Sequence, residues 1–342
     1  MLFILAKMTH LHPSYITFLT EKDVQSVLDW EELILAIEEN FSDVSSVAQF
    51  ADTLTIQPAR GIMQIPHRNG YLLTMPGLSE RKKALTCKLV TLFPDNLTRF
   101  NIPSILANIA VFNPDNGELQ AIVQGTTITE WRTAAASVVA TKYLKPEGRD
   151  TLAVFGAGKQ GRIHIIAFQN YFKFKKVNLW NRTLENAEKL AEELKNEFNL
   201  DVEIFKDAGK CAENADVLVT ATLSSTPVIK YEYLKFNVLI NAVGAGKEHH
   251  NELDKSIYEK SIIYTDSMEN AKVELKGLID EGYRLVGEIG EVINGKEVPD
   301  NDGVVIFHSL GMATEDAVAA KLVLDKFSKE HLEVEVSVEV SV

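Results

Sequence analysis

The stretch from Thr151 to Phe172, TLAVF GAGKQG RIHIIAFQNYF, decides the fold of this chain of 342 residues. Its first five residues are mostly apolar and predict a buried strand, and the apolar spacing after the glycines predicts a helix. Gly156, Gly158 and Gly161 form a GxGxxG pattern between the two. In a dinucleotide-binding unit the first glycine makes the tight turn, the second lets the backbone approach a pyrophosphate, and the third allows close packing of helix on strand. Free N–H groups at the start of the helix favour an anion, so the stretch predicts a dinucleotide site.

The end of the next predicted strand, VNLW at 177–180, indicates which nicotinamide cofactor is preferred. An acidic residue at this place would accept hydrogen bonds from the ribose 2′-hydroxyl of NADH. Asn181, Arg182 and Thr183 stand there instead. A guanidinium can bind a 2′-phosphate as a fork, and the Asn and Thr side chains can donate hydrogen bonds to it. We therefore predict that NADPH binds more tightly than NADH.

Strands and helices alternate through the middle of the chain. VEIF, VLVTA, VLINAVG and IIYTD, between 202 and 266, are further short apolar segments, and helical stretches separate the earlier ones. This alternation is typical of a doubly wound parallel sheet, the Rossmann fold. In the first part, a helical pattern from Asp23 to Phe41 precedes strands that meet at HRNG, 67–70, and NPDNG, 113–117, which are typical hairpin turns. The sequence thus predicts an α/β fold with a Rossmann domain plus an α+β domain of antiparallel strands.

Two segments later in the chain bear on the domain organisation. KPEGRD, 145–150, is polar, contains Pro and Gly, and predicts a linker. After HSLGM, small and apolar residues recur at helical spacing from Ala313 to Phe327, which predicts a helix that packs closely, back onto the first domain. The last residues, LEVEVSVEVSV at 332–342, alternate as a strand does, and we assign them no function.

The composition excludes several classes of function. A formal net charge of −13 argues against general affinity for nucleic acid or anionic membranes. Cys87 and Cys211 lack CxxC spacing, so neither a disulfide framework nor a metal site is predicted, and a reducing, cytoplasmic location is expected. The N-terminal MLFILAK is shorter than the core of a signal peptide, and no apolar run has the length of a membrane span.

Three cations in the first part are candidate substrate ligands. Lys88 lies on the apolar face of the strand-like ALTCKLVTL, where a cation needs an anionic partner. Arg132 falls in the first turn of a helix that Thr127 and Glu130 can open as a capping box, although a positive charge is unfavourable at that end. Arg60, in QPARGIM, precedes a predicted hairpin and is expected to face a cleft. From local sequence alone, a structural ion pair explains each of them equally well.

Eight motifs together carry a family resemblance: QPARGIM, ALTCKLVT, EWRTAAASVVATKYLKP, FGAGKQG, WNRTLENAEK, NAVGAG, GEIGEVINGK and SLGMATEDAVAAK. They resemble the ornithine cyclodeaminase/μ-crystallin family, and its μ-crystallin (ketimine reductase) branch in particular, from Phe18 to Lys329. The resemblance implies a homodimer. It also implies a substrate-binding and dimerisation domain at 1–133 with 308–330, a Rossmann NADPH-binding domain at 134–307, and a tail at 331–342.

The resemblance also implies the roles of site residues. Arg60 and Lys88 match positions that engage a substrate carboxylate, and Arg132 matches a position beside the cofactor and the substrate. Glu288 matches an acidic position near the ligand. The resemblance therefore implies that Lys88 and Glu288 are the catalytic residues. Besides Arg132 and the three glycines, the cofactor-contact positions fall on Ser104, Lys159, Gln160, Asn181, Arg182, Thr183, Asn186, Thr222, Leu223, Val243 and Ser309. Ile105 departs from the histidine of the μ-crystallin branch, which puts one cofactor contact in doubt.

The implied reaction is NADPH-dependent reduction of the C=N bond of a cyclic ketimine carboxylate to a cyclic amino acid. Cyclodeaminase members carry an aspartate where NAVGAG has Gly246, so ornithine cyclodeamination is not expected unless Glu248 takes that place. Three alternatives stay open: an ornithine cyclodeaminase, an alanine-type amino acid dehydrogenase, and an NADPH-dependent thyroid-hormone-binding protein of the μ-crystallin type. The sequence does not identify the proton donor.

Overall fold

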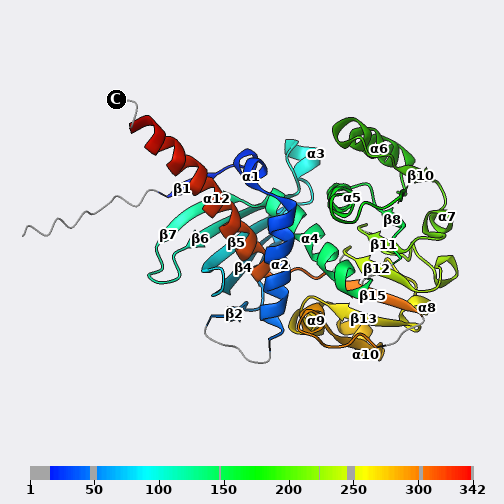
Figure 1. The fold of residues 1–342 in the computed structure, drawn as a ribbon. Helices are drawn as coiled ribbons and strands as arrows, with labels where there is room; N and C mark the ends of the chain where they lie inside the picture. Colours follow the sequence, from blue (N-terminus) through cyan, green and yellow to red (C-terminus); the bar gives the residue numbers. More distant parts are fainter. Residues whose placement is uncertain are drawn as a thin grey trace, which may run out of the picture.

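The computed structural model describes residues 16–46, 52–145, 148–222, 224–244, 251–299 and 303–339, and its strands form two sheets side by side (Figure 1). The first sheet lies within 17–124 and the second within 151–308. The predicted fold class, a parallel α/β unit plus an α+β unit, is confirmed. The predicted domain bounds stay a prediction. The first sheet lies within the predicted substrate-binding domain at 1–133, and the second sheet lies within the predicted Rossmann domain at 134–307 except for His308.

The first sheet is antiparallel except at one edge. Its order is β1-β7-β6-β5-β4-β2, with β3 also on β4 and β1 parallel to β7. Both predicted hairpin turns are present, with Asn69 at φ 47° and Gly117 at φ 77°, in the left-handed region that Asn and Gly tolerate. The strands are β1 Thr17–Leu19, β2 Thr55–Ile56, β3 Gly61–Ile65, β4 Gly70–Ser79, β5 Ala84–Leu92, β6 Ile105–Phe112 and β7 Leu119–Gln124.

Helices cover one face of this sheet. The helix expected over 23–41 is two helices, α1 Glu21–Val27 and α2 Trp30–Val44, because the Asp29 side chain accepts from the backbone N–H groups of Glu31 and Glu32 and starts a new helix. Helix α12, Ala313–Glu339, packs on β4, β5 and β6 beside α2 (Figure 1). The backbone of 331–339 therefore continues a helix and is not the strand that its alternation suggests.

Helix α4, Thr126–Leu144, lies between the two sheets and contacts α2, α5 and α12. The predicted capping box at its start is wrong. Gly125 is the N-cap residue, and the carboxylate of Glu21 accepts from the backbone N–H groups of Thr126 and Thr127 at 2.9 and 2.8 Å. Helix α1 thus supplies the cap, and Arg132 lies beyond the first turn. The residue before Arg132, Trp131, stacks on Trp30 of α2 with ring centroids 4.0 Å apart.

The second sheet is parallel throughout, with the order β10-β9-β8-β11-β12-β15-β13-β14. The order on either side of β8 is the doubly wound Rossmann arrangement, which places a ligand crevice at the carboxyl ends of the strands. The strands are β8 Thr151–Phe155, β9 Lys176–Trp180, β10 Glu203–Phe205, β11 Val217–Thr220, β12 Val238–Ala242, β13 Ser261–Thr265, β14 Leu285–Glu288 and β15 Val304–His308.

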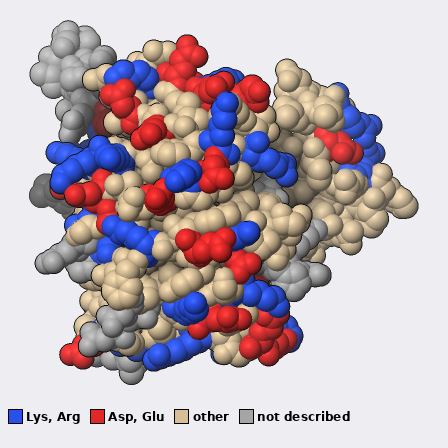
Figure 2. Space-filling view, turned by 90° about the vertical axis from the view of Figure 1, so that its right-hand side faces the viewer, with Lys and Arg blue, Asp and Glu red and all other residues tan. Residues whose placement is uncertain are grey.

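Shorter helices complete the fold: α3 Asn96–Phe100, α5 Lys159–Phe172, α6 Leu184–Phe198, α7 Ala208–Ala212, α8 Lys255–Tyr258, α9 Met268–Glu274, α10 Lys276–Asp280 and α11 Ile289–Ile293. Among the described residues, no helix is both long and apolar enough to cross a membrane. Figure 2 shows the side on which α6, α7 and α8 lie in Figure 1, and acidic and basic side chains are mixed over it.

Candidate active site

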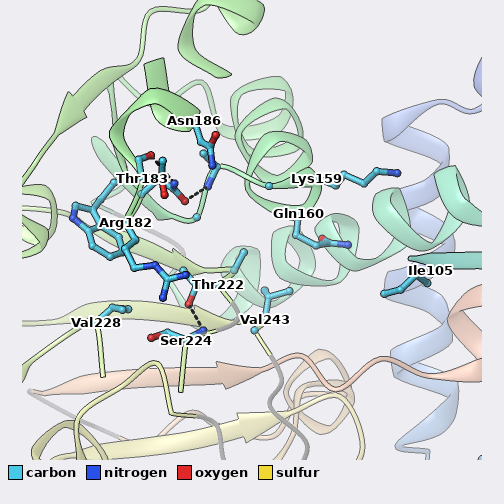
Figure 3. A pocket seen from close by; sticks show the side chains of 17 residues that line it. Ile105, Lys159, Gln160, Arg182, Thr183, Asn186, Thr222, Ser224, Val228 and Val243 are labelled. Carbon is cyan, nitrogen blue, oxygen red and sulfur yellow. Dashed lines mark hydrogen bonds between the residues drawn. The ribbon is translucent and has the colours of Figure 1, made fainter. Parts of the chain in front are cut away.

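A cavity of about 610 Å³ lies at the carboxyl ends of β8, β9, β11 and β12. Ten predicted cofactor residues line it: Gly156, Gly158, Lys159, Gln160, Asn181, Arg182, Thr183, Asn186, Thr222 and Val243. Figure 3 shows that they come from several strand ends and the start of α5 and surround one space. Seven further residues line it as well: Ile105, Ala157, Trp180, Ala221, Ser224, Val228 and Gly244. The strand–turn–helix prediction therefore located the cavity.

The glycine turn has the geometry that a pyrophosphate requires. Gly156 has φ 115°, where other residues are strained. A Cβ on Gly161 would lie 1.8 Å from the carbonyl oxygen of Gly156, so only glycine allows this approach of helix to strand. A Cβ on Gly158 would meet nothing within 4 Å, so its backbone faces open space at the N-terminus of α5. The turn fits a dinucleotide.

Asn181 holds this turn, and Arg182 is left for a ligand. The Asn181 Oδ1 accepts from the Ala157 N–H at 3.0 Å, and its Nδ2 donates to the Thr183 carbonyl at 2.7 Å. Arg182 is exposed, and its guanidinium points across the cavity toward Thr222 (Figure 3). A cation thus stands where the sequence predicted a 2′-phosphate contact.

The opposite wall is supported by Glu252, which the sequence did not reveal. Its Oε1 accepts from the N–H and the hydroxyl of Thr222, at 2.6 and 2.5 Å. Burial raises the pKa of this carboxyl to about 7, against the hydrogen bonds from Thr222. Nothing in the local sequence marks Glu252, because the residues that bury it are distant along the chain.

Other predicted cofactor residues lie around the cavity. Ser104 lines an adjoining cavity, and Gly161 packs beneath the turn. Ser309 is buried, and its N–H donates to the Ala242 carbonyl at 3.1 Å, one residue before the cavity-lining Val243. Leu223, Gly246 and Glu248 lie outside the described residues.

Arg60, Lys88 and Arg132, predicted from three separate motifs, meet at the segment 310–316. Arg60 Nη2 donates to the carbonyls of Leu310 and Gly311, each at 2.8 Å. Lys88, only 2% exposed, pairs with Asp316 at the start of α12. The expected anionic partner of Lys88 is therefore present.

Arg132 completes the group from α4. Its guanidinium pairs with Glu315 at 2.7 Å and with Asp316 at 3.2 Å. Gly311, at φ 77°, lets it approach, since a Cβ there would lie 2.7 Å from Arg132 Nη1. Asp266 accepts from the N–H groups of residues 310 and 311 at 2.7 Å and so fixes the turn between the cations.

This charge cluster contains three cations, Arg60, Lys88 and Arg132, and four carboxylates, Asp266, Glu274, Glu315 and Asp316. Glu274 pairs with Arg60 at 3.0 Å, and both are partly exposed. Burial raises the pKa of Asp266, Glu274 and Glu315, and burial lowers the pKa of Lys88 to about 8 despite the opposing effect of Asp316. Glu315 and Asp316 are charged residues in a helical pattern that is otherwise small and apolar. This departure is the sequence feature that could have revealed the carboxylate partners of Lys88 and Arg132.

Glu288, the other predicted catalytic residue, lies at the N-terminus of α11. Its carboxylate accepts from the Met268 N–H at 2.8 Å and from the Ser45 hydroxyl at 2.6 Å. It lines neither the cofactor cavity nor the adjoining one. Glu288 is the register partner of Thr265 on β13, so its backbone lies beside the residue that precedes Asp266 of the charge cluster.

Known proteins resemble this chain in sequence and in overall fold. The ketimine reductase mu-crystallin of Macropus fuliginosus is 38% identical over 312 residues, which is 91% of this chain and 97% of that protein. Thermococcus litoralis Δ1-pyrroline-2-carboxylate reductase, solved with NADH and L-proline, superimposes with a TM-score of 0.82 at 31% identity, covering 92% and 98% of the two chains. An archaeal alanine dehydrogenase dimer with bound NAD gives the same TM-score at 26% identity, covering 92% and 97%.

The family model described as ornithine cyclodeaminase/mu-crystallin matches residues 16–331. This match includes both sheets, the glycine turn, all three cations and the acidic start of α12. The chain therefore belongs to the ornithine cyclodeaminase/mu-crystallin family.

Proposed function

We propose that the protein is an NADPH-dependent imine reductase that reduces the C=N bond of a cyclic ketimine carboxylate to a cyclic amino acid. The observation that carries this is the adjacency of the two sites. The turn that holds Arg60, Arg132 and Asp266 follows directly after Ser309, whose backbone is bonded to the floor strand of the dinucleotide cavity. An anion held at this turn would therefore lie close to a dinucleotide bound in the cavity.

Each residue has a part in this reaction. Arg60 and Lys88 hold the substrate carboxylate, with Arg132 behind them, and so orient the imine carbon. NADPH, when bound, supplies the hydride, and the imine nitrogen gains a proton. Glu288 is assigned an electrostatic role in favouring the protonated iminium, although both of its oxygens are hydrogen-bonded within the protein.

The panel that tests the proposal is NADPH oxidation with cyclic ketimine carboxylates, with pyruvate plus ammonia, and with ornithine plus NAD. We expect turnover with the ketimines at an ordinary enzyme rate of about 1 s⁻¹ or more. Turnover only with pyruvate and ammonia would identify an alanine-type dehydrogenase instead, and proline formation from ornithine would identify a cyclodeaminase. No turnover, together with tight NADPH-dependent binding of thyroid hormone, would favour the binding protein of the μ-crystallin type.

The preference for NADPH is proposed from Arg182 and from the uncharged Asn181. A charge-assisted bond to a phosphate contributes roughly 1.5–3 kcal/mol, so NADPH should bind about tenfold or more tightly than NADH. Direct titration of both cofactors tests this. Arg182→Ala should weaken NADPH alone, and equal dissociation constants in the parent would remove the assignment.

A homodimer is proposed from the face of the first sheet that α2 and α12 do not cover. Phe18, Ile56 and Leu89 lie on that face and are 58%, 46% and 41% exposed. Large exposed apolar side chains that share one face mark an interface, and an alanine dehydrogenase with this fold is a dimer. Light scattering should give twice the chain mass, and Leu89→Arg should give monomers.

We also propose a cytoplasmic location, since Cys87 and Cys211 are free thiols.

A further inference from the structure

A second cavity, of about 660 Å³, adjoins the cofactor cavity. The two share Ile105, Lys159 and Gln160 in their walls, so they form one continuous space. Ile105 faces this space from the first sheet, opposite Gln160 at the start of α5 (Figure 3). A ligand in one cavity can therefore extend into the other.

Most of the wall surface of the second cavity is apolar, and six of its thirteen lining residues are apolar. Val90 and Ala107 come from β5 and β6, and Leu97, Ile102 and Pro103 come from α3 and the loop that follows it. The only charged residues among its described lining residues are Glu130 and Lys159, which pair with each other at 2.8 Å. The other polar residues that line it, Asn101, Ser104, Thr126, Thr129 and Gln160, are uncharged, so the described wall offers no unpaired charge to a ligand.

Three large apolar side chains around this cavity are exposed: Leu97 by 64%, Ile105 by 52% and Ile102 by 42%. A cluster of exposed hydrophobic side chains around a hollow is typical of a ligand-binding groove. Ile105 is also the position where the μ-crystallin branch has histidine, so this chain replaces a polar ring by an aliphatic side chain at the junction of the two cavities. Both features point to an apolar occupant.

The second cavity lies next to the carboxylate-binding cations. Val90 follows Lys88 by two residues on β5, so both side chains point to the same face, about 7 Å apart. Their register partners on β6 are Ala107 and Ile109. A substrate whose carboxylate is held at Lys88 can therefore place a ring substituent against Val90 and Ala107.

We propose that this second cavity is a subsite for an apolar ring substituent, and that the preferred substrates are ketimine carboxylates that carry an aromatic or large aliphatic group. The inference rests on the proposed imine reduction. Burial of one aromatic group favours the substituted substrate by roughly tenfold or more in kcat/KM.

The test compares the unsubstituted six-membered cyclic ketimine carboxylate with forms carrying a phenyl group at each free ring carbon, using the full chain and NADPH. At least one phenyl form should have a kcat/KM about tenfold above that of the unsubstituted compound. Leu97→Asn should remove this advantage and leave the unsubstituted substrate unchanged. The matched control is Phe100→Asn, because Phe100 is 63% exposed on the same helix and lines neither cavity.

A binding measurement separates this inference from the proposed reaction. Picolinate and its phenyl-substituted forms carry the same carboxylate on a ring that is inert to the enzyme, and calorimetry with the NADP⁺-loaded protein gives their dissociation constants. Tighter binding of a phenyl form, lost in Leu97→Asn, supports the subsite even if no ketimine is turned over. Equal binding of all forms overturns it even if ketimines are reduced. A change of oligomeric state in Leu97→Asn, with substrate preference unchanged, also overturns it, because a second copy would then cover these side chains.

Discussion

The cofactor cavity and the charge cluster are built in opposite ways. The cavity is assembled mostly from neighbouring strand ends of one parallel sheet, and the backbone of Gly158 and the exposed Arg182 guanidinium face open space in it. The charge cluster draws on β5, α4, α9 and α12 together with the turns before β3 and α12, and each of its cations already has a carboxylate partner. The cofactor site is therefore open to a ligand, whereas in the proposed reaction a substrate carboxylate would have to compete with the carboxylates of the protein.

Within the charge cluster, the buried pairs serve stability, and we expect the partly exposed pair to serve recognition of the substrate. Charges as buried as Lys88 and Asp316 are costly unless paired, so the cluster must be satisfied for the chain to fold. Glu274 and Arg60 are the partly exposed members, and exchange of Glu274 for a substrate carboxylate at Arg60 is the route with the smallest rearrangement. Gly158 in the glycine turn contributes less to stability than these buried ion pairs do, because its backbone faces open space.

The largest effect is expected from Asp316→Asn, which removes the carboxylate that pairs with the buried Lys88 and one of the two that pair with the buried Arg132. Breaking a buried pair by removing one partner costs about 3–5 kcal/mol. Chemical denaturation should show a loss of this size. Asp325→Asn on the same helix removes an exposed pair with Lys321 and should cost less than about 1 kcal/mol. Equal losses in the two variants would mean that the cluster is not a structural unit.

Arg60→Met should affect recognition and leave the fold intact. Removal of a cation that grips the carboxylate before and during the reaction should raise KM more than it lowers kcat, with a loss of about a hundredfold in kcat/KM. Steady-state kinetics on the best ketimine measures this. Weaker NADPH binding in the variant would instead assign Arg60 to the cofactor site.

Gly158→Ala should weaken binding of the cofactor at the glycine turn, whereas Arg60→Met should weaken binding of the substrate. A methyl group there meets no protein atom, so the melting temperature should stay the same, but it occupies the space of the pyrophosphate and should weaken NADPH by about tenfold or more. Gly161→Ala is the comparison, since its Cβ would clash with the Gly156 carbonyl and should lower both binding and stability. Unchanged NADPH affinity in Gly158→Ala would place the pyrophosphate elsewhere.

The smallest effect concerns pH. Lys88 loses its proton above about pH 8, and the cluster carboxylates with raised pKa values lose theirs as pH rises, so both changes make the cluster less attractive to an anion at high pH. The dissociation constant of picolinate should therefore increase severalfold from pH 7 to pH 9. NADPH binding should change little over this range. A flat picolinate profile would exclude Lys88 as a carboxylate ligand.

The same contrast explains what the sequence could predict. The strand, turn and helix at 151–172 are contiguous, so local spacing located the dinucleotide cavity. Spacing gave Gly156, Gly158 and the strand end at 181–183, and the family resemblance gave the other five of the ten predicted residues that line it. The capping box at Thr127 and Glu130 failed because Glu21, 105 residues away from Thr126, supplies the cap, and Glu130 pairs with Lys159. Pairings of this kind depend on how the elements pack and leave no periodic signal.

Glu288 and Glu252 show the limit for single carboxylates. The resemblance implies that Glu288 lies near the ligand, and this stays a prediction; in the structure its oxygens accept from the Met268 N–H and the Ser45 hydroxyl. Glu252, which no motif marked, supports Thr222 in the cavity wall. Whether a carboxylate serves a helix end or a ligand site depends on neighbours contributed by other elements.

The three tryptophans give the molecule a built-in optical reporter. Trp30 and Trp131 stack on each other and line neither cavity, whereas Trp180 lines the cofactor cavity. Reduced nicotinamide absorbs light at the wavelengths that the indole ring emits. Excitation energy should therefore pass from Trp180 to bound NADPH, and the fluorescence of Trp180 should decrease. Comparison of the parent with a Trp180→Phe variant would measure how much of the ligand-dependent quenching comes from Trp180.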